Sequence, residues 1–189
     1  MVARYRLAGR RWLARSLCTS VRLLLVGYFV KTRRRLTPTT TERELMAFLL
    51  AGDEPPLPVL RLQWERTSVA KRVHDPQWGL WVDFAVGGDA PTAIPGHFEV
   101  NDVLVEFENV VGGGYCILFV RQGRLAALEL ANWVGPWRPG AILRSITYCR
   151  TILPEDDSQD AEYIPLERRD WTAFRQQLAE SRPPAPGAT

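Results

Sequence analysis

The sequence predicts an α+β domain in which an antiparallel β-meander of about four to five strands follows two N-terminal helices and precedes one C-terminal helix. Two observations predict this fold class. Residues 78–131 alternate apolar and polar side chains with the period of two that is typical of strands, and glycine-containing turns interrupt them. On both sides of that stretch, apolar side chains recur at helical spacing instead.

The helices are predicted from capping residues and apolar stripes. Thr41 and Glu44 stand at the spacing of a capping box, so we expect the first helix to begin at Thr41. Its apolar stripe consists of Leu45, Phe48 and Leu49. A second, short helix is expected over residues 58–66, because Pro58 suits a first helical turn. Asp170 is the expected N-cap of the C-terminal helix.

The strands of the meander are predicted from strict alternation. Residues 78–86 form one strand, and residues 100–109 form another, with an acidic outer face made of Asp102, Glu106 and Glu108. The three glycines at 112–114 lie between two strands, which predicts a bend or bulge. They do not predict a phosphate-binding loop, since no helix follows them. The pair at 122–123 predicts a two-residue hairpin turn.

These elements divide the chain into five segments. The prediction is a basic, partly apolar extension at residues 1–35, an α+β domain at 36–153, an acidic linker at 154–169, a helix at 170–181 and a disordered tail at 182–189.

Charge is distributed unevenly along the chain. The whole sequence has 24 basic and 21 acidic residues, and residues 1–35 hold ten of the basic ones and none of the acidic ones. Residues 36–189 therefore carry 14 basic and 21 acidic residues, a net charge of −7. Nucleic-acid binding depends on Lys and Arg neutralising phosphates, so no nucleic-acid partner is expected for the domain. A basic protein partner would suit it better.

The extension at residues 1–35 contains one apolar run, Leu17–Val30, which includes Arg22. A helix of that length spans about 21 Å, whereas the hydrocarbon core of a bilayer measures about 30 Å. A transmembrane helix is therefore not expected. Weak contact of residues 1–35 with an anionic membrane is an alternative, through the apolar run and the arginines. The predicted location is the cytoplasm, with membrane association as the alternative.

Few residues could carry catalysis. His74 and His97 are the only histidines, and His74 with Asp75 or His97 with Glu99 could hold a metal or form a general-base pair. Asp83 and Glu106 are the other carboxylates that could act with a histidine in a small hydrolase-type enzyme. The sequence has no H-E-x-x-H or H-x-H spacing and no glycine-rich loop of the nucleotide-binding kind. We therefore expect no metal site and no cofactor, and an enzyme is the less favoured of the readings.

A non-catalytic protein-binding or regulatory module is favoured. Its candidate binding residues are Trp133 and Trp137 in a proline-glycine loop, together with Asp102, Glu106 and Glu108. The cysteines Cys18, Cys116 and Cys149 are odd in number and widely spaced, which argues against a disulfide framework. A bond between Cys116 and Cys149 is left open, as are the oligomeric state and the identity of the partner.

Residues 35–137 resemble a family of small uncharacterised bacterial proteins, a domain of unknown function. The resemblance lies in the run RLTPTTTERELMAFLLAGDEPPLPVLRLQWERTSV, the strand WGLWVDFAV, and the hairpin ILFVRQGRLAALELANWVG with its V-R-x-G-R-L-x-x-L-E pattern. It implies that the domain begins near Arg35, with residues 1–34 outside it. It implies no activity.

Overall fold

A computed structural model describes residues 5–6, 36–76, 79–108, 110–134, 140–152 and 162–180. In these residues the chain forms one antiparallel β-sheet and three helices, so the α+β class is confirmed. The sheet has eight strands in the order β1-β8-β7-β4-β5-β6-β3-β2. This is more than the four to five strands predicted. About four of them were placed within residues 78–131, where β3 to β6 lie, and the sheet continues on both sides with β1, β2, β7 and β8.

The strands follow the chain as a meander with two additions. Their bounds are β1 Tyr5–Arg6, β2 Thr67–Asp75, β3 Gly79–Val86, β4 His97–Phe107, β5 Val110–Arg121, β6 Arg124–Asn132, β7 Leu143–Ile152 and β8 Glu162–Leu166. The β5–β6 hairpin turns at Gln122 and Gly123, which both have positive φ. This confirms the predicted two-residue turn. Gly112 and Gly113 also have positive φ, but they lie within β5, where the pairing with β4 shifts register. These glycines therefore form part of a strand.

The three helices are α1 Thr40–Leu49, α2 Leu57–Trp64 and α3 Trp171–Glu180. Asp170 caps α3 as predicted, because its Oδ1 accepts from the backbone of Thr172 and Ala173 at 3.1 Å. The capping box of α1 was predicted two residues too late. Thr39 is the N-cap, and Glu42 is its partner. The sequence TTTERE offers two threonine–glutamate pairs at the same spacing, and only Glu42 also meets Arg72 of β2.

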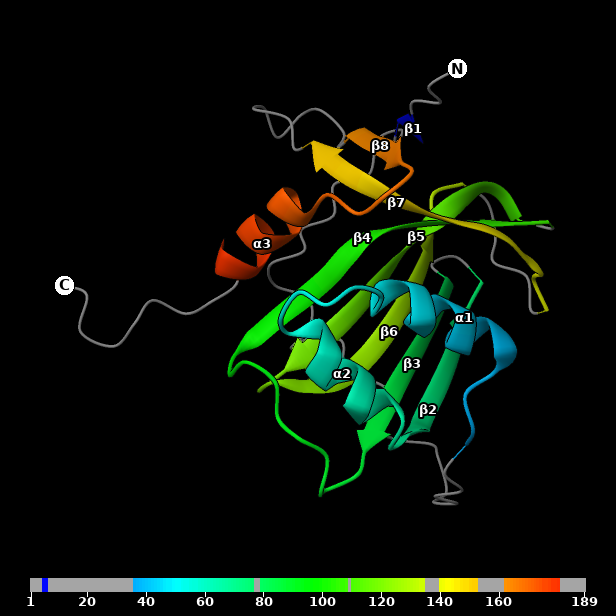
Figure 1. Ribbon diagram of the computed structural model, residues 1–189. Coiled ribbons are helices and arrows are strands. Elements are labelled where there is room, and N and C mark those ends of the chain that lie inside the picture. Colours follow the sequence, from blue (N-terminus) through cyan, green and yellow to red (C-terminus); the bar gives the residue numbers. More distant parts are fainter. Residues whose placement is uncertain are drawn as a thin grey trace, which may run out of the picture.

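All three helices contribute to a single hydrophobic core against one face of the sheet (Figure 1). The core side chains of the central strands alternate along each strand: Leu80, Val82, Cys116, Leu118, Val120, Leu128 and Leu130. Leu45, Leu49, Leu57, Leu60, Phe174 and Leu178 cover them from α1, α2 and α3. Because strand side chains alternate between faces, the residues between these positions project from the opposite face.

Strand β8 was not predicted. Residues 154–169 were expected to form an acidic linker, but Glu162–Leu166 pair antiparallel with β7, Tyr148 lying opposite Leu166. The apolar residues of this five-residue strand follow an acidic run in the sequence. The composition of the whole region therefore indicated a linker. Residues 153–161 and the predicted tail at 182–189 lie outside the described residues. Apart from Tyr5 and Arg6, so does the extension at 1–35.

A buried ion pair joins the C-terminal part of the chain to the sheet. The Nε atom of Arg169 lies 2.6 Å from Oδ2 of Asp102, and the Arg169 side chain is only 1% exposed. The same guanidinium donates to the carbonyl oxygens of Leu49 at 2.9 Å and Ala51 at 2.8 Å, which end helix α1. It also lies over the rings of Tyr148, Trp171 and Phe174.

Asp102 reaches Arg169 because of a β-bulge. Val100 pairs with Leu118 and Val103 pairs with Cys116, so β4 advances three residues while β5 advances two. This corrects the predicted acidic outer face, since Asp102 binds a buried arginine and does not face solvent. Burial raises the pKa of Asp102, and the positive charge of Arg169 acts against that rise.

Two further buried polar groups attach the other helices to the sheet. Glu42 of α1 is 1% exposed and accepts from Arg72 of β2 at 2.6 and 2.8 Å. Gln63 of α2 is fully buried, and its amide donates to the carbonyl oxygens of Pro91 and Gly123 while its Oε1 accepts from the backbone of Leu125. Each helix therefore has a polar contact that fixes its position on the core.

Cys116 and Cys149 are both buried free thiols, which answers the open question of their pairing. Among the described residues, no helix is long and apolar enough to cross a membrane.

We predict that Arg169→Met lowers the free energy of unfolding by about 3–5 kcal/mol, because Asp102 and two helix carbonyls would lose their buried partner. Urea denaturation followed by circular dichroism measures the change. The control is Arg66→Met, since the Arg66–Asp89 pair is exposed and such pairs contribute about 0–1 kcal/mol. Equal losses in the two variants would contradict the role given to Arg169.

Candidate functional site

The face of the sheet opposite the helices is the candidate site. We call it the helix-free face and define it by six side chains on the four strands β3 to β6: Trp81, Glu99, Tyr115, Ile117, Phe119 and Glu129. Five of them lie between two core residues, Tyr115 lies between Gly114 and the core residue Cys116, and none of the described helices packs on this face. All six are half-buried.

The register of the strands brings these six residues together. Glu129 of β6 lies opposite Trp81 on one side and opposite Ile117 on the other. Glu99 of β4 lies opposite Phe119. Side chains directly opposite or diagonal on neighbouring strands are close enough to contact. Two carboxylates are therefore set among aromatic and aliphatic side chains at the centre of the sheet.

Aromatic contacts on this face fall into two groups. The ring centroids of Trp81 and Phe119 are 5.1 Å apart, and the Trp81 indole donates to Oδ1 of Asp83 at 2.8 Å. Tyr115 stacks on Tyr163 of β8 with ring centroids 6.2 Å apart, and Trp133 lies 5.3 Å from the same ring. Ile117 of β5 stands between Phe119 and Tyr115 along the strand, and we call the two groups together the aromatic surface.

Glu129 has the most altered acidity on this face. Burial and, to a smaller extent, the negative charge of Glu99 together raise the pKa of Glu129 from 4.5 to about 7. Burial also raises the pKa of Glu99, although Arg121 opposes that shift. The pKa of the Tyr115 hydroxyl is raised by burial and then by Glu129. Ionisation of Glu99 and Glu129 on this face therefore costs free energy. A cation placed beside these carboxylates would reduce that cost.

Among the described residues, the positive charges near this face lie toward its margins. Arg121 ends β5 near Glu99, and Lys71 of edge strand β2 lies opposite Asp83. Neither lies in the row of residues that contains Glu129. The centre of the helix-free face therefore remains acidic.

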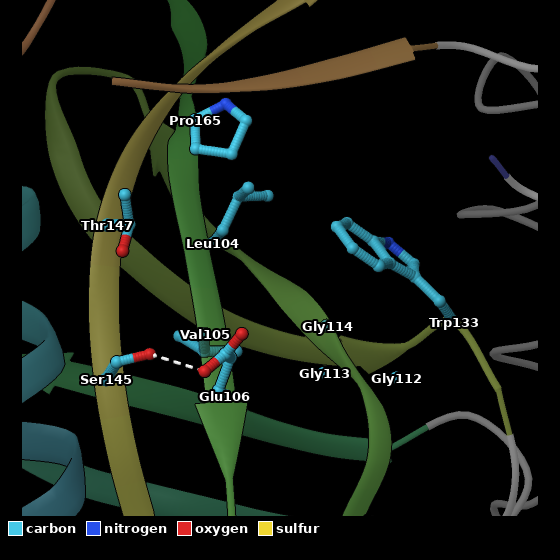
Figure 2. A pocket seen from close by; sticks show the side chains of 10 residues that line it. All are labelled: Leu104, Val105, Glu106, Gly112, Gly113, Gly114, Trp133, Ser145, Thr147 and Pro165. Atoms are coloured by element: carbon cyan, nitrogen blue, oxygen red, sulfur yellow. Dashed lines mark hydrogen bonds between the residues drawn. The ribbon is translucent and has the colours of Figure 1, made fainter. Parts of the chain in front are cut away.

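A small pocket adjoins the helix-free face where β4, β5 and β7 meet. Figure 2 shows Trp133 on one side of it, the glycines 112–114 of β5, and the hydrogen bond from the Ser145 hydroxyl to Glu106, which measures 3.0 Å. The pocket measures about 60 Å³. Pockets for drug-sized ligands are typically about 300–1,000 Å³, so this one does not suit such a ligand.

The residues considered for catalysis do not lie close together. His74 is exposed on β2 and His97 is exposed on β4. Three strands separate them, so at about 4.8 Å per strand they stand roughly 19 Å apart across the sheet. Asp83 and Glu106 are separated by two strands, a distance of roughly 14 Å. In the described part of the chain, no group of three His, Cys, Asp or Glu residues could hold a metal ion.

The residues proposed for binding divide into three kinds. Asp102 is bonded to Arg169 on the helix side, as described above. Glu106 belongs to the pocket and Glu108 is exposed at the end of β4. Trp133 is half-buried against Tyr163 and so forms part of the aromatic surface. Trp137 lies outside the described residues.

Sequence reasoning missed Glu129 and named Glu99 only as a partner for His97. Glu129 is the one acidic residue in the strand RLAALELAN, which was a usable signal for a special environment. The proximity of Glu99 to Glu129 could not be found from the sequence, because the two residues lie on β4 and β6 and only the pairing of both strands with β5 brings them together.

Comparison with known proteins adds no assignment, since no family model, curated protein or solved structure matches this chain. The function therefore has to be argued from the geometry of the helix-free face.

We predict that Glu129→Gln stabilises the protein more at pH 8 than at pH 5. The difference between its effects on the free energy of unfolding at the two pH values should be about 1–2 kcal/mol. The folded pKa of Glu129 is about 7, above the ordinary 4.5, so the wild-type chain loses stability as the pH rises through this range. Glutamine resembles the protonated acid and does not ionise. Urea denaturation at both pH values measures the difference.

The matched control for that prediction is Glu65→Gln, because Glu65 is exposed at the end of α2. It should shift stability equally at pH 5 and pH 8. A Glu129→Gln variant that showed the same pH independence would mean that the acidity of Glu129 is ordinary.

Proposed function

We propose that this chain is a non-catalytic protein-binding module, and that its helix-free face binds a basic, partly apolar segment of a partner protein. The observation that supports this most directly is the placement of Glu99 and Glu129 among aromatic and aliphatic side chains on a sheet face. Interfaces of this kind combine an apolar centre with a few charges that decide which partner fits.

The chemistry of the face indicates what a partner would supply. A lysine or arginine beside Glu129 would favour the ionised carboxylate and offset the effect of burial on its pKa. The same cation could lie over the rings of Trp81 or Phe119, where cation–π attraction adds to the ion pair. Leucine- or valine-sized side chains would cover Ile117.

The geometry favours binding over hydrolysis. A hydrolase would need an acid and a base within reach of one bond, whereas His74 and His97 lie on strands separated by three others. Glu129 can hold a proton at neutral pH, but its neighbours in its row are Trp81 and Ile117, which offer no base or nucleophile.

We also propose a cytoplasmic location, because the buried free thiols of Cys116 and Cys149 suit a reducing compartment. Membrane contact through residues 1–35 stays a prediction of the sequence. The partner remains defined by its chemistry alone, as a cationic segment with apolar side chains.

A synthetic peptide that repeats Lys-Leu-Gly tests the proposal. We expect it to shift the NMR signals of Trp81, Ile117 and Phe119, and the Glu129→Lys variant should bind it about tenfold more weakly. A peptide of the same length that repeats Glu-Leu-Gly should cause no such shifts.

The control variant is Glu65→Lys, which makes the same charge change on the helix side of the molecule. It should bind the Lys-Leu-Gly peptide as the wild type does. If Glu129→Lys and Glu65→Lys weaken binding equally, the attraction is to net charge and the helix-free face is not the site.

We predict that affinity for the Lys-Leu-Gly peptide rises about fivefold to tenfold between pH 6 and pH 8. Glu129 loses its proton in this range, and the cation binds the ionised form better. Glu99, Tyr115 and Tyr163 are the other titratable groups that influence this part of the face. Isothermal titration calorimetry measures the trend, and Glu129→Gln should flatten it. An unchanged slope in that variant would assign the titration to another group.

A further inference from the structure

Strand β2 is the last strand at one edge of the sheet (Figure 1). Within the described part of the chain, the only backbone pairing on its outer side is at Val69, which exchanges hydrogen bonds of 2.8 and 3.0 Å with Leu36. Beyond Val69, no other described residue pairs with that side. An edge of this kind presents a row of backbone donors and acceptors to which another strand can bind.

Residues 71–75 form the regular part of this edge. They pair one-to-one with residues 79–83 of β3, without a shift in register. The bulge of β2 lies before them, between Val69 and Lys71. Bulges and covering segments are devices that keep edge strands from pairing with other molecules. In β2 the bulge and the bridge to Leu36 both lie at the Val69 end, so residues 71–75 keep the geometry that a further strand needs.

The side chains of residues 71–75 are complementary to themselves. Lys71 and Asp75 stand on either side of Val73 at equal spacing, and Val73 is 38% exposed and lies opposite Trp81. When two β2 strands pair antiparallel about Val73, Lys71 of each copy lies opposite Asp75 of the other. Opposite charges directly across a strand pair stabilise it, whereas like charges destabilise it. The centre of the pair is an apolar contact between the two Val73 side chains.

Other symmetric registers do not fit the sequence. Centring the pair on Arg72 places two arginines opposite each other, and centring it on His74 places Val73 opposite a carboxylate. Centring it on Lys71 places two lysines together and brings the Leu36 bridge into the interface. The register about Val73 combines two ion pairs with an apolar centre, and it stays clear of that bridge.

We propose that this chain forms a symmetric dimer, in which residues 71–75 of two copies pair antiparallel about Val73. On the helix side, His74 of each copy lies opposite Arg72 of the other, whose charge is already met by Glu42 of its own chain. Facing side chains stay on one side of a sheet, so the two helix-free faces lie on the same side of the dimer. The inference goes beyond the proposed function and does not depend on it. Two adjacent faces would let a partner with two basic segments bind both.

The small size of the interface sets the expected affinity. Stable protein–protein interfaces bury about 1,200–2,000 Å² in total, and an interface made of five facing residue pairs falls below that range. We therefore expect a dissociation constant on the order of 0.1 mM.

Sedimentation equilibrium of the full-length protein measures the self-association directly. With that dissociation constant, about 15% of the chains should be in dimers at about 10 µM and about 80% at about 1 mM. A wild type that stays monomeric at about 1 mM overturns the inference and leaves the proposed function standing.

An exchange of charges tests the register. Lys71→Glu places like charges opposite each other at two positions of the dimer, and so does Asp75→Lys. Each variant alone should therefore self-associate about tenfold more weakly than the wild type. An equal mixture of the two variants should recover the wild-type affinity, because every facing pair then again has opposite charges. The double variant that combines Lys71→Glu with Asp75→Lys should recover it for the same reason.

The controls are Arg144→Glu on β7 and Glu180→Lys on α3, which make the same charge changes at exposed positions away from β2. Neither control should alter self-association, and a mixture of the two should associate no more than the wild type. That mixture excludes a general attraction between molecules of opposite charge change. If Lys71→Glu and Arg144→Glu weaken association equally, or the mixture of Lys71→Glu and Asp75→Lys stays monomeric, the inference is wrong.

Discussion

The ion pair between Arg169 and Asp102 is the interaction on which the arrangement of this protein depends. One guanidinium binds a carboxylate of β4, ends helix α1 through two carbonyl oxygens and lies against the rings that begin α3. Burying an arginine is costly unless its donors are satisfied. Here the cost is offset by contacts that come from three parts of the chain, so those parts are held in one relative position.

That constraint explains why the two faces of the sheet differ. On the helix side, each buried polar group meets its complement: Arg169 meets Asp102, Arg72 meets Glu42, and the Gln63 amide meets backbone groups. On the helix-free face, Glu99 and Glu129 are buried enough to raise their pKa values, and the charge of Glu99 raises that of Glu129 further. Strain of this electrostatic kind is typical of functional sites. The fold thus leaves Glu99 and Glu129 partly buried on this face, and the charge of Arg121 acts against the rise in the pKa of Glu99.

The sequence predicted those features that depend on neighbours along the chain. The hairpin at Gln122 and Gly123 and the Asp170 cap of α3 both involve residues within a few positions of each other, and both are present. The α1 cap was displaced by two residues because a distant residue, Arg72, selects Glu42. Both the bulge that turns Asp102 toward Arg169 and the pairing of β8 depend on contacts between remote segments. No local pattern contains that information.

The same limit applied to the candidate site. His74, His97 and Asp83 were chosen for their chemistry, but the strand order places them on separate parts of the sheet. Glu129 could be recognised from the sequence as an acid in a mainly apolar strand. The effect of Glu99 on its pKa follows only from the strand order, which places Glu99 two strands away. A cluster of charges assembled from several strands cannot be found from spacing in one of them.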